Sequence, residues 1–474
     1  MKSLNMSNTA RPASGFTLVE LMVAIALGIL LSVGLVTLFG ATSKTNRVQD
    51  AMAQLQENGR YAMTRLNNDL RLVGHQTLNV AGFANTPPGA AANPDGIVDA
   101  DMAADVYVAT INLPDFAAAG LSAPAGWPAA TPWPLSQRYY LQGYECSTGT
   151  CAPLPATGTS NDLPVIGTTA GTRLGTADVM SVRYMNSNGW SLSRNELAET
   201  TSAGTTCTGG SLATLTVTPY AGNTSVTPNV PPGPAFNFGN LDLVMLVTGS
   251  RAEIFQVTVA GNTLIPVSVV GGTVPCFPTT PSAADVQVFN FSKDFVTVTY
   301  YVKLDADAND ATRVIPVLVR RQSNVVAGAV VGSDQELVQG VEQLDFLVGI
   351  ERGDAKVSYL TADLVAGQSS YANCPPEPAQ YSLQMPVGTA DPECMWRAVK
   401  SIEARVLINS INNLFDLIDA DMAYQYTYNY DGTDNPQLRG PPAAPTVNMP
   451  SGIKAGKMLR REFVSMVSIR NYNP

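Results

Sequence analysis

The amino-acid sequence predicts an α+β protein, in which one long N-terminal helix packs on an antiparallel β-rich head with long loops. Three observations support this fold class. Residues 16–73 contain no proline and read as one continuous helix. From residue 178 onward, several short segments alternate between apolar and polar side chains, as half-buried strands do. The composition, with 14% charged residues, 39 Gly and 33 Pro among 474 residues, is typical of β-structure joined by long loops.

The first part of the predicted helix, residues 16–41, is apolar enough to cross a membrane. Glu20 is its only charged residue. At about 1.5 Å per residue, a helix from Leu21 to Ala41 covers the roughly 30 Å hydrocarbon core of a bilayer. The preceding residues carry Lys2 and Arg11 and no acid. Because positive charge stays inside, we expect residues 1–15 in the cytoplasm and the bulk of the chain outside it.

Residues 42–75 continue the helix with one apolar face, which must be covered, most simply by the rest of the chain. Gly59 should weaken this helix by about 1 kcal/mol relative to alanine, and Gly74 should end it at the C′ position. The apolar residues at helical spacing are Val48, Met52, Leu55, Met63, Leu66, Leu70 and Val73.

The rest of the chain divides into a loop-rich insertion, residues 76–177, and a β-rich globular head, residues 178–474. The insertion is rich in Ala, Pro, Gly and Thr and shows weak periodicity apart from residues 137–141. Residues 365–393 and 428–456 are predicted surface loops. The predicted strands are 178–184, 212–217, 241–248, 253–259, 264–270, 296–304, 314–320, 396–408 and 463–469, and one more that carries Leu344, Phe346, Val348 and Ile350 on one face.

Two local patterns give more specific predictions. Residues 296–304 alternate so regularly that one buried face is expected, and the polar residues 305–310 should turn this strand into a hairpin with 314–320. Residues 333–336, Ser-Asp-Gln-Glu, have the pattern of a capping box and predict a short helix.

All six cysteines lie beyond the apolar helix, in the part of the chain expected in an oxidising compartment, which favours disulfides. Six cysteines allow 15 connectivities, and the sequence does not choose among them. Our working hypothesis pairs sequence neighbours: Cys146 with Cys151, Cys207 with Cys276, and Cys374 with Cys394. A zinc site is disfavoured because there is no CxxC and the sole histidine is His75, which we interpret as a packing residue.

The charge pattern argues against nucleic-acid binding. The net charge is −10 and the pI is about 4.7, which disfavours broad attraction to a polyanion. Two basic pairs, residues 320–321 and 460–461, fall in predicted strands. Because neighbouring strand side chains point to opposite faces, one arginine of each pair should be solvated, and the other should meet an acid or stack on an aromatic ring.

No catalytic residues are predicted, and we expect neither an enzyme nor a cofactor. GxSxG, HExxH and GxGxxG motifs are absent. Asp305, Asp307 and Asn309 offer the first three positions of a calcium loop, but Asp310 stands where glycine is needed and Pro316 where the bidentate glutamate is needed. We therefore interpret these acids as solvated turn residues and predict no metal site.

The order of Gly15, Phe16 and Glu20 ahead of the apolar run resembles the class III leader of type IV prepilins and type II pseudopilins. That resemblance implies cleavage between Gly15 and Phe16 by a prepilin peptidase and N-methylation of Phe16. A carboxylate in an apolar segment is usually paired. Glu20 is expected to pair with the new Phe16 amine of its own or a neighbouring subunit; alternatively, it reaches the headgroups. Ala24, Gly28 and Ser32 follow at four-residue intervals and form a small-residue stripe for close helix packing.

Residues 55–61, 69–75, 178–184 and 460–471 resemble PilW-type minor pilins. This resemblance implies an inner-membrane protein with a periplasmic head that helps to prime type IV pilus assembly, with other minor pilins and the major pilin as partners. It also implies a pilus-tip location, contact with a tip adhesin, and a contribution to twitching motility and cell adhesion. The alternatives are a J-type minor pseudopilin of type II secretion, or a membrane-tethered periplasmic adhesin or enzyme.

Overall fold

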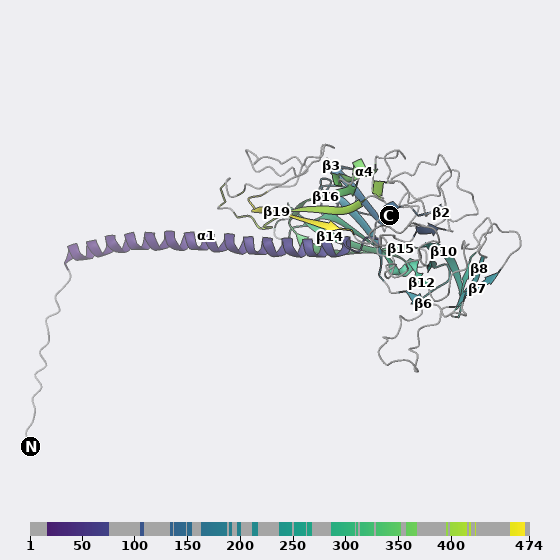
Figure 1. Cartoon of the computed structure of the whole chain (residues 1–474). Helices are drawn as coiled ribbons and strands as arrows, with labels where there is room; N and C mark the ends of the chain where they lie inside the picture. Colours follow the sequence, from purple (N-terminus) through teal and green to yellow (C-terminus); the bar gives the residue numbers. More distant parts are fainter. Residues whose placement is uncertain are drawn as a thin grey trace, which may run out of the picture.

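A helix of 53 residues, α1 (Leu18–Leu70), leads into a head built from three β-sheets (Figure 1). The computed structural model describes residues 17–74, 105–108, 133–135, 137–147, 149–153, 163–186, 189–191, 197–200, 211–216, 237–248, 251–261, 263–267, 286–308, 310, 313–326, 329–351, 357–366, 395–396, 399–414, 417–418, 422 and 456–469. The predicted α+β class is confirmed, and so is the single long N-terminal helix from Leu18 onward.

The helix ends slightly earlier than its apolar pattern predicts. Its last α-helical residue is Leu70 and its cap is Arg71, so Gly74 lies three residues beyond the cap instead of at C′. Gly74 has a φ of 67°, a left-handed conformation that glycine adopts without steric cost. Its N–H donates to the carbonyl oxygen of Arg183 at 3.2 Å, which ties the chain leaving the helix to the sheet.

The central sheet has six strands in the order β15-β14-β13-β5-β3-β4. Its members are β3 (Leu141–Ser147), β4 (Thr150–Ala152), β5 (Val179–Met185), β13 (Phe295–Ala306), β14 (Val314–Val326) and β15 (Ala329–Gln339). The predicted hairpin is confirmed: β13 and β14 are antiparallel, and Ala306 lies opposite Val314 next to the turn.

Three sequence predictions are wrong in this sheet. Residues 333–336 lie within β15, because pairing with β14 places Asp334 opposite Arg321 and overrides the local capping pattern. The face of β13 that carries Thr297, Thr299 and Tyr301 is buried too, because this inner strand is covered on both sides of the sheet. Residues 141–147, placed in the loop-rich insertion, form a strand between β5 and β4.

A second sheet of four strands, in the order β17-β16-β18-β19, lies beside the helix. Its members are β16 (Val341–Glu351), β17 (Val357–Leu360), β18 (Val399–Asn409) and β19 (Arg460–Ser468). The four apolar residues predicted to share one face of β16 are all buried in the main core: Leu344, Phe346, Val348 and Ile350. The last two predicted strands, 396–408 and 463–469, correspond to β18 and β19. β19 is the edge strand next to α1.

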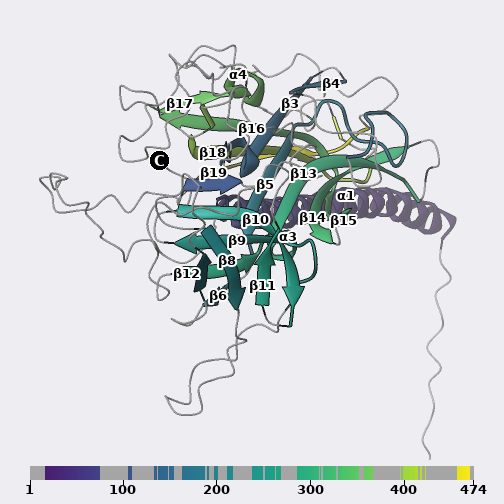
Figure 2. The ribbon, with the colours of Figure 1, turned by 90° about the vertical axis from the view of Figure 1, so that its right-hand side faces the viewer.

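The third sheet has nine strands and lies on the opposite side of the head from β16 and β17 (Figure 2). Seven follow the order β6-β12-β9-β10-β11-β8-β7, and β1 pairs with both β10 and β2. The β1–β10 ladder is parallel. The strands are β1 (Asp105–Val108), β2 (Trp133–Pro134), β6 (Trp190–Ser191), β7 (Leu197–Thr200), β8 (Ser211–Thr216), β9 (Leu243–Thr248), β10 (Arg251–Ala260), β11 (Thr263–Pro266) and β12 (Val286–Asn290). Three short helices complete the described elements: η2 (Gln137–Tyr139), α3 (Phe291–Asp294) and α4 (Ala362–Ala366).

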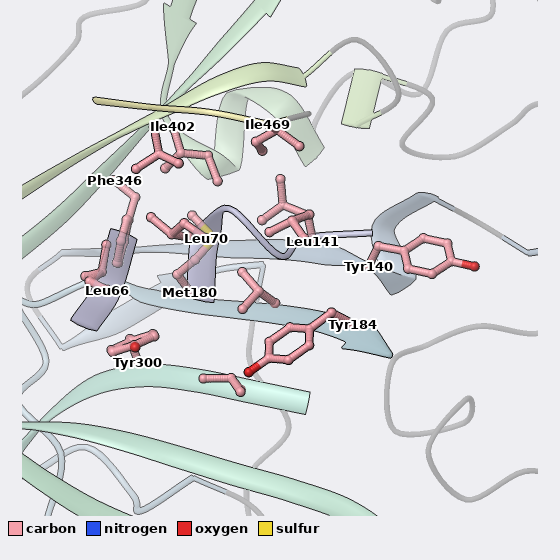
Figure 3. Close-up of a cluster of buried hydrophobic side chains, with 14 of the residues drawn as sticks. Leu66, Leu70, Tyr140, Leu141, Met180, Tyr184, Tyr300, Phe346, Ile402 and Ile469 are labelled. Atoms are coloured by element: carbon pink, nitrogen blue, oxygen red, sulfur yellow. The ribbon is translucent and has the colours of Figure 1, made fainter. Parts of the chain in front are cut away.

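The hydrophobic core forms where the end of α1 passes between the sheets. Leu66 and Leu70 lie between Phe346 and Ile402 on one side and Met180 and Tyr300 on the other (Figure 3). These side chains come from α1, the four-stranded sheet and the six-stranded sheet, so the helix shares one core with the head. Of the predicted apolar face, Leu55, Met63, Leu66, Leu70 and Val73 are buried, whereas Met52 is exposed.

Candidate assembly site

The first half of α1 has an apolar surface that no described residue of the head covers. Every residue from Leu18 to Thr42 is exposed. Within the described residues, α1 is the helix that is long and apolar enough to cross a membrane. Fifteen large hydrophobic side chains between Leu18 and Phe39 are more than half exposed. Exposure of so large an apolar surface to water is unfavourable in free energy. This half of the helix therefore needs lipid or other apolar helices around it.

The first turn of α1 is closed by a reciprocal capping box between Thr17 and Glu20. The Glu20 N–H donates to Thr17 Oγ1 at 3.2 Å, and the Thr17 N–H donates to Glu20 Oε2 at 3.0 Å. The carboxylate therefore points back toward the N-terminal end of the helix, where its negative charge also complements the helix dipole. Gly15 and Phe16 lie outside the described residues, so cleavage, N-methylation and the Phe16–Glu20 pair stay predictions.

The predicted small-residue stripe lies on the exposed surface of the helix. Ala24, Gly28 and Ser32 are all exposed, and a Cβ added to Gly28 would meet no atom within 4 Å. The Ser32 hydroxyl donates to the Gly28 carbonyl oxygen at 2.7 Å, so it is satisfied within its own helix. The stripe is geometrically free to receive another helix, and its role in packing stays a prediction.

Where α1 enters the head, Gly59 allows a close contact with the edge strand. A Cβ on Gly59 would lie 2.2 Å from the ring of Phe463 in β19. Real Cβ atoms do not come this near to another atom, so the ring occupies the space that glycine leaves. Further along the same pair of elements, the Asn67 side-chain amide donates to Ser465 Oγ at 2.7 Å. β19 is thus fixed along the helix at two points.

A buried charge network then holds the last turn of α1 to the six-stranded sheet. Arg320 on β14 donates from Nε to Asp69 Oδ2 at 2.6 Å and from Nη2 to Oδ1 at 3.3 Å. The exposed fractions of these two side chains are only 6% and 4%. Two tyrosine hydroxyls complete the shell: Tyr184 donates to Oδ1 at 3.0 Å and Tyr300 to Oδ2 at 2.5 Å. Every strong acceptor direction of the Asp69 carboxylate is used.

The tyrosines of this network remain donors throughout the physiological range. Burial, and then the neighbouring Asp69 carboxylate, raise the pKa of Tyr184 to about 12. The same two causes raise the pKa of Tyr300. Because both hydroxyls keep their protons, Asp69 is never left facing a phenolate. A carboxylate with a bidentate arginine and two hydroxyl donors is well compensated for its removal from water.

The expected division into one solvated and one partnered arginine is confirmed for the second pair, where Arg461 is exposed, and is wrong for the first pair, where both arginines meet an acid. Arg320 meets Asp69, and Arg321 forms an ion pair with Asp334 at 3.2 Å. In the second pair, Arg460 Nε donates to Glu342 Oε2 at 2.6 Å. The guanidinium of Arg461 lies 5.8 Å from the centroid of the Phe463 ring. Arg460 and Glu342 are both buried and tie β19 to β16.

The acids considered for calcium face cations in the described structure. Lys303 Nζ lies 3.1 Å from Asp305 Oδ1, and Arg313 Nη1 lies 3.2 Å from Asp307 Oδ2. Asn309 lies outside the described residues. Asp305 and Asp307 are therefore partly buried ion-pair members and not freely solvated turn acids. Their expected failure to hold calcium stays a prediction.

One of the three hypothesised disulfides is confirmed. Cys146 and Cys151 are joined across the β3–β4 hairpin, where they lie opposite each other. Cys207, Cys276, Cys374 and Cys394 lie outside the described residues. His75 also lies outside them.

Sequence reasoning missed Asp69, although its position carried a usable signal. Asp69 lies three residues after Leu66 and one before Leu70, on the face of α1 that the apolar spacing assigns to the core. A charged residue at a core position requires a buried counter-charge. Arg320 is one of the four arginines expected to find an acidic or aromatic partner. Taken together, the two signals make Asp69 a candidate partner for one of these arginines.

Comparison with known families identifies the class of protein that these features define. Residues 10–36 match the prokaryotic N-terminal methylation motif. An exposed apolar helix that begins with this motif and ends inside a β-rich head fits a membrane-anchored protein of the type IV pilin class.

The second match is more specific. Residues 299–471 match the family of type IV pilus-assembly protein W, PilW. Together the two matches support a PilW-like type IV minor pilin. The match spans β14 to β19 and most of β13, and so includes Arg320, Glu342 and Phe463; the nine-stranded sheet precedes it. No curated protein and no solved structure matches the chain.

Proposed function

We propose that this minor pilin helps to prime type IV pilus assembly as part of a tip complex with other minor pilins. The observation that supports the proposal best is the contrast between the two halves of α1. Residues 18–42 are exposed and largely apolar, while the half from Ala51 to Leu70 packs on the head, first in a small apolar cluster and then, from Ala62 onward, in the main core. A rigid head fixed to a bare apolar helix can leave the bilayer only if similar helices replace the lipid.

In this proposal the chain first spans the inner membrane with its head in the periplasm. Prepilin peptidase cuts after Gly15 and methylates Phe16. Extraction into the pilus then places the Glu20 carboxylate next to the Phe16 amine of a neighbouring subunit. The capping geometry supports this step, because the carboxylate already points to the end of the helix where the new amine forms. Partners would include the major pilin and a tip adhesin, and the chain would act without catalysis or a cofactor.

N-terminal mass spectrometry of protein recovered from sheared surface fibres tests the proposal. The expected result is a mature chain that begins with N-methyl-Phe16. A chain that begins at Met1, or one trimmed on the far side of the bilayer, would contradict it.

Deletion of the gene separates this proposal from its nearest alternative, a J-type minor pseudopilin of type II secretion. Loss of piliation and twitching with secretion intact is the expected outcome. Loss of secretion with piliation intact would assign the chain to the secretion system. The PilW match favours the pilus.

A further inference from the structure

A buried arginine lies next to the Cys146–Cys151 disulfide. Arg173 Nη1 lies 3.3 Å from Cys151 Sγ and 3.5 Å from Cys146 Sγ. Arg173 is 1% exposed, and both cysteines are buried. The guanidinium therefore faces two neutral sulfur atoms in the interior of the head.

Within the part of the chain that the structure describes, no carboxylate forms an ion pair with Arg173, and its Nε has no hydrogen-bond partner. Burial lowers the pKa of Arg173, and the nearby Tyr301 offsets part of this decrease. Arginine nevertheless stays protonated in proteins. A buried charge without a counter-ion is costly, so the oxidised head carries a cation that an anion at the sulfur position would stabilise.

Reduction of the disulfide would create that anion, and the geometry distinguishes the two sulfur atoms. Cys151 Sγ is the nearer to Arg173. Cys146 Sγ lies 3.6 Å from the carbonyl oxygen of Tyr144, an acceptor that suits a protonated thiol. The Cys146 N–H also donates to Asp178, and Glu145 precedes it, so acidic groups border Cys146. In the reduced protein we therefore expect a thiolate at Cys151 and a protonated thiol at Cys146.

We propose that Cys146–Cys151 is a redox-active disulfide that exchanges with a dithiol reductant, and that Arg173 stabilises its reduced form as an ion pair with the Cys151 thiolate. A thiolate of the reductant attacks Cys146 Sγ, and Cys151 leaves as the thiolate. The second thiol of the reductant then displaces Cys146. The reductant loses two electrons and becomes a disulfide; Cys146 keeps one proton as a thiol, and one proton goes to solvent.

The hairpin offers a route for the reductant. β4 has three residues and forms one edge of its sheet, and Gly149 and Thr150 in the connecting turn are exposed. Local opening of such a short edge strand requires far less free energy than global unfolding. The sulfur atoms can therefore be reached without loss of the core.

The test uses the full chain in detergent, equilibrated in buffers with defined ratios of reduced to oxidised dithiothreitol. After an acid quench, differential alkylation and peptide mass spectrometry report the oxidised fraction of Cys146 and Cys151 alone. Arg173→Met should shift this equilibrium toward the disulfide by about tenfold or more, since one pKa unit of thiolate stabilisation corresponds to a factor of ten. Arg173→Lys, which keeps the charge, should recover part of the effect.

Arg183→Met is the matched control, because Arg183 is also buried but donates to Tyr139 O and Thr297 Oγ1 instead of to sulfur. It should leave the equilibrium unchanged. An Arg173→Met equilibrium equal to that of the wild type, or an equal shift in Arg183→Met, would overturn the proposal.

A second measurement leaves Arg173 in place and so does not depend on whether its variants fold. In Cys146→Ser, the remaining Cys151 thiol is the one nearer to Arg173. In Cys151→Ser, the remaining Cys146 thiol is slightly farther from Arg173 and also faces Tyr144 O, with Glu145 and Asp178 nearby. Tyr301, the other titratable group beside Arg173, is common to both variants. The pH dependence of alkylation should show that the Cys151 thiolate forms at the lower pH. The opposite order would contradict the proposal.

Discussion

The ring of Phe463 lies directly over Gly59, in the space that any larger residue would fill. This contact reverses the expected effect of a helix glycine. On propensity alone, Gly59→Ala should stabilise α1 by about 1 kcal/mol. In the folded protein the new methyl group would displace the Phe463 ring, and overpacking costs about 1–3 kcal/mol.

Gly59→Ala is therefore expected to destabilise the protein or, at best, to leave its stability unchanged, and the measurement is thermal unfolding of the full chain in detergent. Gly40→Ala is the matched control, because nothing lies within 4 Å of its added Cβ. Combining Gly59→Ala with Phe463→Ala should remove the clash, so the two effects should be non-additive. Stabilisation by Gly59→Ala alone would show that the ring does not hold this position.

Loss of Asp69 should cost more than any other single change in α1 that we consider. Asp69→Ala leaves the Arg320 guanidinium buried without its counter-ion and removes the acceptor for two tyrosine hydroxyls. The expected loss of unfolding free energy is about 3–5 kcal/mol.

The double replacement Asp69→Leu with Arg320→Met removes both charges and should be much milder, because apolar residues can often replace a buried ion pair. The measurement is the free energy of unfolding in denaturant for the wild type, Asp69→Ala and the double variant. Equal destabilisation in the single and double variants would mean that packing, and not charge compensation, dominates this site.

A cluster of acids beside the disulfide should make the head less stable as the pH rises. Burial, and then the charge of Asp363, raise the pKa of Glu145 to about 7. Burial and the charge of Glu145 also raise the pKa of Asp178 and of Asp345. A folded state with a raised acid pKa binds more protons than the unfolded state, so unfolding free energy is lost as the pH rises from about 4.5 to about 7.

Replacing Glu145 with glutamine should remove part of this dependence and raise the unfolding temperature near pH 8. The expected gain is on the order of 2 kcal/mol, after allowance for the partial exposure of Glu145. Glu57→Gln, an exposed change on α1, is the control. If the wild type and Glu145→Gln lose stability in parallel between pH 5 and pH 8, the Glu145 carboxyl is not responsible.

These contacts show which parts of the structure could be read from the sequence. Residues 18–70 and most strands were predictable, because apolar spacing along a helix or strand is a local signal. Residues 333–336 were mispredicted because the local capping pattern competes with a long-range ladder: Asp334 lies opposite Arg321, thirteen residues away in sequence. β3 was missed because its role depends on pairing with β5, about forty residues later.

The site was predictable to a different degree in each half of α1. The leader and Glu20 follow a short contiguous pattern, which the match over residues 10–36 also covers. The anchoring of the head depends on residues far apart in the chain, such as Asp69 with Arg320 and Gly59 with Phe463. No spacing rule links such residues, so their pairing required the folded structure.

Glu20→Ala should leave leader cleavage largely intact but lower incorporation into fibres. Once Phe16 carries a free amine, the carboxylate is the expected counter-charge for it in the apolar interior of a fibre. The measurement is the ratio of mature protein in sheared fibres to that in membranes. Glu57→Ala, an exposed acid on the head-proximal part of the same helix, is the control. Normal incorporation of Glu20→Ala would count against the ion pair.

The small-residue stripe predicts a difference between two neighbouring positions on the same helix. Gly28 has no atom within 4 Å of an added Cβ, so Gly28→Leu should not disturb the fold of the isolated chain. In a bundle, however, the larger side chain would keep a partner helix from approaching closely. Ile29→Leu changes only the shape of a side chain that is already large and exposed. Both variants should therefore unfold like the wild type, while Gly28→Leu alone enters fibres several-fold less. Equal incorporation of the two variants would show that helices in the fibre do not pack through this stripe.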